Sequence, residues 1–331
     1  MKPDQEFEAE YRAASEGALA LDRSHLATIG ARGKDRESFL QNMLTNDVSS
    51  LPAMAGIPAA FLTVKGKLVS DLLVFKDENG FILQMESERA EPLRKALDRY
   101  IISEDVALES LVEREATFSI EGPGASEILE ALTSPPSPDL DALPHLHFRN
   151  LEIGGFPARL TAHRRELTPR FDVTASPDAA KTLLDTVVAR GALLGGELVR
   201  EARRIEASRP RFGVDMDESH LPQEASLDEA ISFQKGCYIG QEYVVRLAHR
   251  GHVNRKLRGL RIAGMIPALP GAPVLRDDAE VGVVTSSAPS PAFGCALALA
   301  YLRREHGEPG STVTAGKVVA TVSGLPFDRP A

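Results

Sequence analysis

The chain has 331 residues, of which 43% are hydrophobic and 26% are charged, close to the average of globular proteins. At about 100–200 residues per domain, this length predicts roughly two or three domains. The formal net charge of −9 argues against a surface that binds nucleic acid or anionic membranes over its whole extent. Aromatic residues make up only 5% of the chain, which disfavours a stacking platform for single-stranded nucleic acid.

Two cysteines, Cys237 and Cys295, are too few for a disulfide framework in a chain of this length. They are also too few for a four-thiolate zinc site or iron–sulfur cluster, so we expect no stably bound metal. The N-terminal residues are acidic and contain no apolar run of signal-peptide length. No window of the sequence is apolar enough to span a membrane. These features predict a cytoplasmic protein without a membrane partner.

Helices and strands alternate in the first half of the chain. Residues 1–23 are interpreted as an N-terminal extension with a helix over 4–16, ahead of a folded body that begins near Ser24. A first α+β lobe is expected over 24–115. Its landmarks are a helix capped by Asp35, a hairpin turn at Lys65-Gly66 and a helix capped by Ser87.

A similar order of elements indicates a second α+β lobe over 116–250, with a helix that begins at Ser176-Pro177. The pattern then changes to short strands separated by Gly and Pro turns, which predicts a small antiparallel barrel over 251–331. The six strands of this barrel are expected at Leu257–Ile262, Pro273–Leu275, Val281–Thr285, Ala296–Tyr301, Thr312–Thr314 and Lys317–Val322.

The most unusual segment is Lys235-Gly-Cys-Tyr-Ile-Gly-Gln-Glu242, in which two glycines bracket a cysteine. Gly236 suggests a backbone conformation that a Cβ would penalise, and Gly240 lies where a helix from Gln241 can begin. A thiol just before a helix N-terminus and two residues from a lysine is in a setting that favours the thiolate. Cys237 is therefore a candidate redox, nucleophilic or metal-binding group. The alternative is a small, buried, apolar cysteine.

A basic strip follows directly. Arg246–Arg261 contains six Lys/Arg, two His and no acid, within an otherwise acidic chain. Such a strip attracts anions, for example phosphates, a polyglutamate tail or RNA. The alternative is a solvated face whose partners are nearby acids. An RNA-binding domain would usually be strongly basic and carry stacking aromatics, so tRNA contact through this strip stays an alternative.

The segment Lys235–Glu242 resembles the signature of the YgfZ-type folate-binding proteins. These are relatives of the glycine-cleavage T-protein, a tetrahydrofolate-dependent aminomethyltransferase. Other segments, from about Ser24 to Phe327, are similar to the same superfamily in the same order. They are Phe39–Val48, Gly66–Asp71, Gly122–Ala125, Arg204–Glu206, Pro222–Glu224 and Gly282–Ser287.

This resemblance implies an α+β fold of three lobes, two α+β lobes and a C-terminal antiparallel β-barrel, around a central folate pocket. It implies that tetrahydrofolate or another reduced folate binds, with the Glu206 carboxylate accepting two hydrogen bonds from the pterin edge. The alternative for Glu206 is an ordinary helix salt bridge to Arg203. The further candidate folate-site residues are Arg204, Lys235, Gln241 and Arg246, the last within the strip that could receive the folate's glutamate tail.

Two departures from the T-protein pattern argue against conventional aminomethyl transfer. T-proteins carry an Asp-Asp pair near the hairpin, whereas this chain has Ser70-Asp71, and an alcohol cannot act as a carboxylate base. The loop over 163–170 also lacks the Thr-Gly-Glu-Asp-Gly-like sequence of T-proteins. Asp71 is a candidate catalytic carboxylate, with capping of the following turn as the alternative.

We therefore predict a folate-binding protein that supports iron–sulfur cluster assembly or repair, with Cys237 as its functional thiol. The resemblance supplies this pathway and the expected partners, which are iron–sulfur proteins or their assembly factors. Disulfide exchange, transient cluster ligation and a one-carbon adduct all suit such a thiol. A tetrahydrofolate-dependent one-carbon transferase and an RNA-contacting protein related to tRNA modification are the alternatives. Cys295 is expected to be a core thiol of the barrel.

Overall fold

The computed structural model describes residues 3–136 and 139–329, except for the side chains of residues 3, 4, 249 and 250. The chain divides into two units, each assembled from separate stretches of sequence. The first unit comprises residues 1–61, 70–196 and 230–239, and the second comprises residues 62–69, 197–229 and 240–331. This division differs from the expected boundaries. Most of both α+β lobes falls in one unit, residues 62–69 and 197–229 join the barrel in the other, and the signature segment divides after Ile239.

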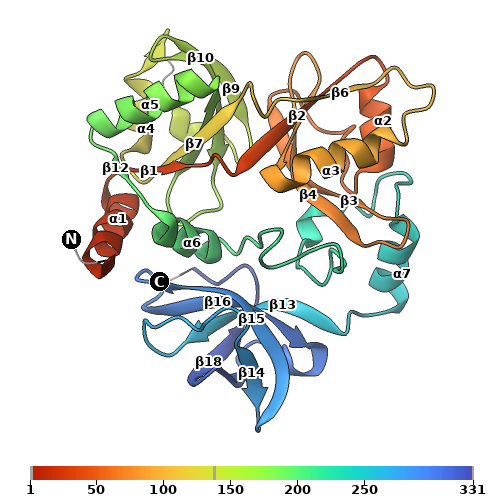
Figure 1. Ribbon diagram of the computed structural model, residues 1–331, viewed down its shortest axis with the longest axis vertical. Coiled ribbons are helices and arrows are strands. Elements are labelled where there is room, and N and C mark those ends of the chain that lie inside the picture. Colours follow the sequence, from red (N-terminus) through yellow and green to blue (C-terminus); the bar gives the residue numbers. More distant parts are fainter. Residues whose placement is uncertain (1–2, 137–138, 330–331) are drawn as a thin grey trace. The chain divides into compact units, whose positions relative to one another are not determined.

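A five-stranded sheet in the first unit has the strand order β3-β4-β5-β2-β6 (Figure 1). The predicted hairpin is confirmed, since β3 and β4 are neighbours joined through a turn in which Gly66 has a φ of +72°. The elements of this part are β2 (Leu26–Arg32), α2 (Arg36–Met43), β3 (Ala55–Leu62), β4 (Leu68–Lys76), β5 (Phe81–Glu86), α3 (Ser87–Asp98) and β6 (Ala107–Ser110).

A seven-stranded sheet follows in the same unit, in the order β12-β1-β7-β11-β10-β9-β8. Its strands are β1 (Leu19–Asp22), β7 (Ala116–Glu121), β8 (Thr133–Ser134), β9 (Phe148–Ile153), β10 (Phe156–His163), β11 (Arg170–Ala175) and β12 (Leu193–Leu194). The helices of this part are α1 (Pro3–Glu16), α4 (Ala125–Glu130) and α5 (Pro177–Ala189), and short 3₁₀ turns in the chain lie at Leu140–Ala142, Asp228–Ala230 and Arg304–His306.

Strand β1 lies within residues 1–23, which were expected to form an extension. It pairs antiparallel with β7 and parallel with β12, and its residues Leu19 and Ala20 are fully buried. A four-residue strand has no stability of its own and forms only against neighbours that are distant in sequence. The folded body therefore starts before Ser24, and the helix predicted over 4–16 is confirmed as α1.

The helix starts agree with the sequence in part. Helix α5 begins after Ser176 with Pro177 in its first turn, as predicted. The residue before α3 is Glu86, so Ser87 is the first helical residue and the predicted cap is displaced by one position. Asp35 precedes α2, but its carboxylate accepts a hydrogen bond from the Asp105 N–H at 2.9 Å instead of capping the helix.

The two sheets of the first unit share an apolar junction. Phe75 of β4 and Phe148 of β9 pack edge to face with ring centroids 5.8 Å apart, and Ile82 and Leu146 complete the cluster. All four side chains are nearly inaccessible to solvent. Because burial of such side chains is the main favourable term in folding, this cluster joins the two sheets into one body.

The second unit contains a closed antiparallel barrel in the order β13-β16-β15-β14-β17-β18 (Figure 1). Alternate residues of its strands, such as Leu260 and Ile262 of β13, fill the interior. All six predicted strands are confirmed: β13 (Arg255–Ile262), β14 (Pro273–Arg276), β15 (Ala279–Ser290), β16 (Cys295–Arg303), β17 (Thr312–Ala315) and β18 (Val318–Ser323).

Helix α6 (Glu197–Glu206) is tied to the barrel through the buried carboxylate of Asp215. One carboxylate oxygen accepts hydrogen bonds from the hydroxyls of Thr285 and Ser286 on β15, at 2.5 and 2.7 Å. The other accepts from the Arg204 guanidinium at 2.7 Å and from the Arg211 main-chain N–H at 2.9 Å. Four donors on three segments thus converge on one buried anion.

No helix within residues 3–136 and 139–329 is long and apolar enough to cross a membrane.

Replacing the Asp215 carboxylate is expected to weaken the second unit strongly. In Asp215→Asn the half-buried Arg204 cation keeps Glu201 but loses its second carboxylate, and the amide puts a donor where an oxygen accepts hydrogen bonds. This should lower the free energy of unfolding by about 1–3 kcal/mol. Urea unfolding of Asp215→Asn, with Asp278→Asn on an exposed turn of the same unit as control, measures this loss. Equal stability of the two variants would contradict the role given to Asp215.

Candidate functional site

The segment that carries Cys237 is held by the connection between α2 and β3. Thr45 is fully buried, and its hydroxyl donates to the Ala230 carbonyl at 2.6 Å while accepting the Ala60 N–H at 2.8 Å. The Thr45 carbonyl in turn accepts the Ser232 N–H at 3.0 Å. These bonds fix the start of residues 230–239 against the first sheet.

The Lys235 ammonium fixes the same segment further along. Its Nζ donates to three main-chain carbonyls, those of Gln41 at 2.5 Å, Leu44 at 2.7 Å and Asn46 at 2.8 Å. An ammonium has three N–H donors, so these carbonyls account for all of them. They lie at and beyond the C-terminal end of α2, where unpaired carbonyls and the helix dipole favour a cation. Burial lowers the pKa of Lys235 to about 8, and Asp47 opposes this shift.

Beyond this anchor the chain presents Cys237 to solvent and turns Tyr238 inward. Cys237 is an exposed free thiol. The Tyr238 ring is buried, with Lys235 Nζ 5.3 Å from its centroid, and burial raises the pKa of Tyr238 to about 12. Its hydroxyl has no hydrogen-bond partner among the described residues. The buried alternative for Cys237 is therefore wrong, because it is the neighbouring tyrosine that is buried.

Only one of the two signature glycines is required by its surroundings. A Cβ on Gly236 would meet nothing within 4 Å, and the residue has no positive φ, so the expected constraint at this position is wrong. Gly240, in contrast, has a φ of +83° and precedes α7 (Gln241–Arg250), which confirms the predicted helix. A Cβ on Gly240 would lie 2.6 Å from the Thr63 carbonyl oxygen. The start of α7 therefore packs directly on the hairpin tip of the second unit.

Two further candidate residues lie on α7. Gln241 is the first helical residue and is half-buried. Arg246 is exposed, and its guanidinium lies 4.8 Å from the centroid of the Tyr243 ring, one turn earlier on the helix. This stacking is a cation–π contact that orders the Arg246 side chain without burying it.

Ser70 and Asp71 lie on opposite faces of β4, because successive residues of a strand alternate. Ser70 is fully buried, and its hydroxyl donates to the Asp71 carbonyl at 2.8 Å. Asp71 is half-buried. Loss of solvation raises the pKa of Asp71 to about 6, with a hydrogen bond to the main chain and the charge of Arg89 acting in the opposite direction. A carboxyl group with this pKa can exchange protons near neutral pH.

The loop over 163–170, which departs from the T-protein pattern, belongs to a buried charge cluster. Arg170 binds both oxygens of Asp172 at 2.8 Å and also contacts Glu166 at 3.1 Å. His163 Nε2 lies 3.0 Å from Asp172. Burial alone would raise the pKa of Asp172, but Arg170 and His163 outweigh it and hold that pKa well below its usual range. The carboxylate of this loop, Glu166, is thus used in internal pairing.

Glu206, at the end of α6, is buried and paired within the second unit. Its carboxylate accepts from Arg203 at 3.0 Å and from the Ser290 hydroxyl at 2.5 Å. The expected Arg203 salt bridge is therefore present, and Ser290 adds a second fixed donor. Arg204 points elsewhere: its guanidinium binds Glu201 and Asp215. Arg204 and Glu206 thus have different partners. Arg204 pairs with Glu201 and Asp215, whereas Glu206 contacts Ser290 at the end of β15.

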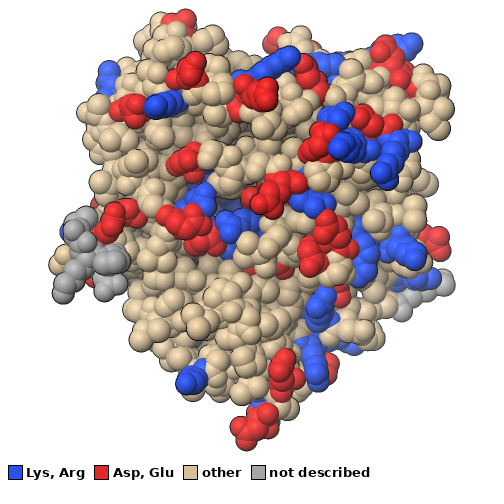
Figure 2. Space-filling view, in the orientation of Figure 1, with Lys and Arg blue, Asp and Glu red and all other residues tan. Residues whose placement is uncertain are grey.

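The basic strip over Arg246–Arg261 is divided among separate partners. Arg255 stacks on Tyr301, Lys256 pairs with Asp228 at 2.9 Å, and Arg261 lies over the Phe293 ring. The side chains of His249 and Arg250 lie outside the described residues. On the face drawn in Figure 2, basic and acidic side chains are interspersed and form no continuous field of one sign.

Cys295 differs from its expected position in the barrel core. It is the first residue of β16 and is half-buried, whereas its neighbour Ala296 is fully buried in the interior. The alternation of strand residues places Cys295 on the outer face. Burial still raises its pKa, with Arg261 opposing. Within residues 3–136 and 139–329, no group of three or more His, Cys, Asp or Glu side chains is placed to hold a metal ion.

The residues that sequence reasoning passed over are those that hold the candidates in place. The sequence indicated no separate role for Thr45, Asp215, Tyr238 or Ser290, which are parts of longer segments. Their roles depend on hydrogen bonds between segments far apart in sequence, such as Asp215 to Ser286. A buried polar residue inside a matching segment is the only signal that could have pointed to them.

Comparison with known families agrees with this architecture. The profile of the GCVT N-terminal domain matches residues 3–235, and that of the glycine cleavage T-protein C-terminal barrel domain matches residues 255–328. The chain belongs to the glycine cleavage T-protein family. An aminomethyltransferase of Rubrobacter xylanophilus is 30% identical over 98% of this chain and 86% of its own length.

Two further proteins are similar over most of this chain. A putative chloroplastic transferase of Arabidopsis thaliana is 26% identical over 94% of this chain and 71% of its own length. The crystal structure of the glycine cleavage system aminomethyltransferase T from Bartonella henselae matches with a TM-score of 0.87. That match covers 98% of this chain and 90% of that one at 20% identity, and it confirms the fold.

Removing the Lys235 ammonium is expected to loosen the loop of the T-protein-like scaffold that carries Cys237. In Lys235→Met three carbonyls lose a charged donor, which should lower the free energy of unfolding by about 1–3 kcal/mol. Amide hydrogen exchange over 230–239 should also become faster. Lys65→Met, at an exposed lysine of the hairpin tip, is the matched control. Identical exchange in both variants would contradict the anchoring role.

The raised pKa of Asp71 predicts a pH-dependent stability. Between about pH 4 and pH 6 the folded protein binds a proton at Asp71 that the unfolded chain does not, so this group lowers stability as pH rises through that window. Asp71→Asn should therefore gain stability relative to the wild type from pH 4 to pH 7. Urea unfolding at several pH values measures the difference, with Asp185→Asn on α5 as control. A pH-independent difference for Asp71→Asn would contradict the assignment.

Proposed function

We propose that this T-protein family member is a reduced-folate-binding protein of the YgfZ type that supports iron–sulfur cluster assembly or repair. The observation that carries the proposal is the exposed Cys237 on a loop whose neighbours, Lys235 and Tyr238, are both fixed. A loop anchored in this way presents its thiol in a defined position, as a functional site requires. The similarity of the segment Lys235–Glu242 to the YgfZ signature supports the finer assignment.

Folate binding is supported by the family and by the chemistry of Glu206. T-proteins use tetrahydrofolate, and a bound reduced folate supplies a carrier for one-carbon groups. The Glu206 carboxylate is desolvated and oriented by Arg203 and Ser290. A carboxylate held in one orientation suits the paired donors of an amino-pyrimidine edge. Because the Glu206 side chain is only 1% exposed, the pterin would replace one of its present donors. The role of Glu206 would be to bind and orient the pterin.

Two features favour this function over aminomethyl transfer, the activity after which several relatives are named. Ser70 is buried on the face of β4 opposite to Asp71, so no second carboxylate stands beside Asp71 at this position. The loop over 163–170 contributes its acid Glu166 to a buried pair with Arg170. Asp71, with a pKa of about 6, remains as a group able to take up or release a proton.

A single exposed thiol suits a transient role with an iron–sulfur client. One thiolate cannot hold a cluster alone, but it can provide one ligand or enter thiol–disulfide exchange with a partner. Cys295 is less suited, because burial raises its pKa and lowers its thiolate fraction at neutral pH. The two cysteines therefore form a natural pair of test and control.

Complementation tests the thiol directly. In a host from which the gene is deleted, we expect the activity of iron–sulfur enzymes to fall and to be restored by the wild type. Cys237→Ala should restore little activity, and Cys295→Ala should restore it nearly fully, at equal protein levels by immunoblot. Full restoration by Cys237→Ala would refute the functional thiol.

Calorimetric titration tests the folate site independently of any cellular role. Tetrahydrofolate should bind the wild type, and Glu206→Gln should bind at least about ten-fold more weakly, because one charge-assisted hydrogen bond contributes about 1.5–3 kcal/mol. Glu280→Gln, at an exposed position on β15, is the control. An unchanged dissociation constant for Glu206→Gln would remove Glu206 from the site.

A further inference from the structure

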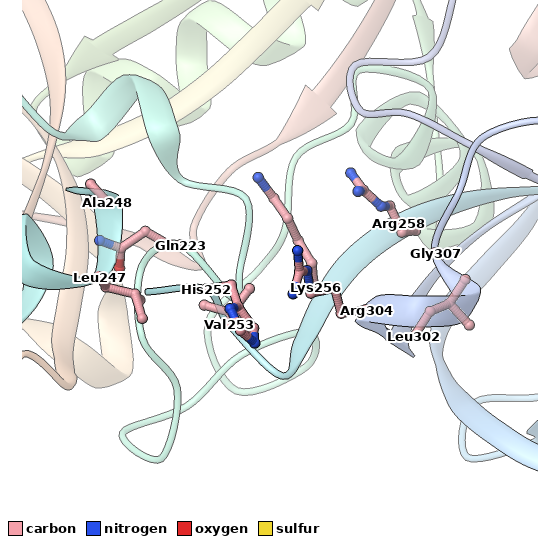
Figure 3. Close-up of a pocket in the computed structure, with 10 residues that line it drawn as sticks. All are labelled: Gln223, Leu247, Ala248, His252, Val253, Lys256, Arg258, Leu302, Arg304 and Gly307. Carbon is pink, nitrogen blue, oxygen red and sulfur yellow. The ribbon is translucent and has the colours of Figure 1, made fainter. Parts of the chain in front are cut away.

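A pocket of about 260 Å³ lies in the second unit, between the barrel and the C-terminal end of α7 (Figure 3). Apolar walls are provided by Leu247 of α7 and by Leu302 of β16, a residue of the barrel core. This volume lies just below the range of about 300–1,000 Å³ that is usual for ligand pockets, so the space suits a small molecule. Mouths of β-barrels are among the places where such pockets occur.

Two cations enter this pocket from β13. Lys256 and Arg258 share the strand face of Leu260 and Ile262, because alternate residues point to the same side. Leu260 and Ile262 fill the barrel core, so Lys256 and Arg258 continue the inward face beyond it, at one end of the barrel. Figure 3 shows both side chains leaving β13 on the same side.

A third cation, Arg304, lines the pocket from the turn after β16, and His252 adds an imidazole. None of the pocket's lining residues is an acid. Lys256 is paired with Asp228, whose side chain is 61% exposed. Three cations and one paired carboxylate leave about two positive charges for a ligand. A phosphomonoester carries about −1.5 to −2 near neutral pH and matches this charge, whereas a monocarboxylate supplies half of it.

The guanidinium groups of Arg258 and Arg304 also lack carboxylate acceptors among the described residues. Within the described ranges, neither Arg258 nor Arg304 has a carboxylate at salt-bridge distance, and Arg258 Nε is buried with no hydrogen-bond partner. A buried N–H without an acceptor is costly and rare in folded proteins. An oxyanion in the pocket would supply the acceptor, and guanidinium is the side-chain group best matched to phosphate.

We propose that this pocket binds a small phosphomonoester, with the phosphate held by Lys256, Arg258 and Arg304 and an apolar body lying against Leu247 and Leu302. The site uses none of Glu206, Asp71 or Cys237, so it goes beyond the proposed folate and thiol function. Its test is therefore independent of whether the protein binds folate or uses the Cys237 thiol.

Titration calorimetry of the full chain with phenyl phosphate tests the proposal. We expect binding at one site, weakened at least about ten-fold by Arg304→Gln and by Arg258→Gln, since each removes one charged donor. Arg303→Gln is the matched control, because Arg303 is exposed on the adjacent position of β16 and does not line the pocket. Arg304 is itself exposed, so its variant keeps the test valid if Arg258→Gln unfolds.

Three comparison ligands decide the chemistry. Inorganic phosphate should bind more weakly than phenyl phosphate because it leaves the apolar walls uncovered, and benzoate should bind more weakly because it carries half the charge. Tri-γ-glutamate should also bind more weakly, since its charges are spread along a chain. The proposal is overturned if millimolar phenyl phosphate does not bind, if Arg304→Gln binds it as tightly as Arg303→Gln does, or if any of the three other ligands binds as tightly.

Discussion

The contact on which the signature loop depends is one lysine ammonium held by three main-chain carbonyls. Lys235 reaches the end of α2 and takes up the carbonyls of Gln41, Leu44 and Asn46. A helix end leaves carbonyls unsatisfied, and a cation there gains both hydrogen bonds and a favourable dipole. Between the fixed Lys235 and the buried Tyr238, the chain exposes Cys237. The position of the Cys237 thiol thus depends on the hydrogen bonds of Lys235 and the burial of Tyr238.

A related device organises the second unit around an anion. The buried Asp215 carboxylate collects donors from Arg204, Arg211 and two hydroxyls of β15, and so joins α6 to the barrel. Both arrangements follow one rule, that a buried charge is tolerated when hydrogen bonds satisfy it. The difference lies in the partners. Backbone carbonyls surround Lys235, whereas side chains supply three of the four donors to Asp215.

Much of this fold could be predicted from local sequence. The six barrel strands, the hairpin at Gly66 and the helix from Gln241 follow from alternation, turn residues and periodicity, which act over a few residues. Strand β1 could not be found in this way, because four residues form a strand only beside β7, about a hundred positions later. The carbonyl partners of Lys235 could not be found for the same reason, since they lie near residue 44. Sequence proximity to Cys237 suggested an electrostatic effect on the thiol, and the structure shows an anchor.

The resemblance to folate proteins located candidates that physical reasoning alone would have ranked low. Glu206 is one helical glutamate among many in a chain with 47 acids, and only the family segment singled it out. Its burial, with Arg203 and Ser290 as fixed donors, adds a physical reason. At Gly236, in contrast, the family segment suggested a constraint that the structure lacks. A Cβ there would meet open space, and the residue has no positive φ. Membership of a motif therefore did not indicate which of its residues are constrained.

Because Ser70 stands where T-proteins carry a second carboxylate, we expect that this T-protein scaffold does not catalyse aminomethyl transfer. The most direct measurement is the formation of methylenetetrahydrofolate from tetrahydrofolate and an aminomethyl donor, with the purified full-length protein as catalyst. We expect folate to bind and the rate to stay at that of the reaction without protein. Turnover well above that rate, and lost in Asp71→Asn, would contradict the account and identify the chain as a one-carbon transferase.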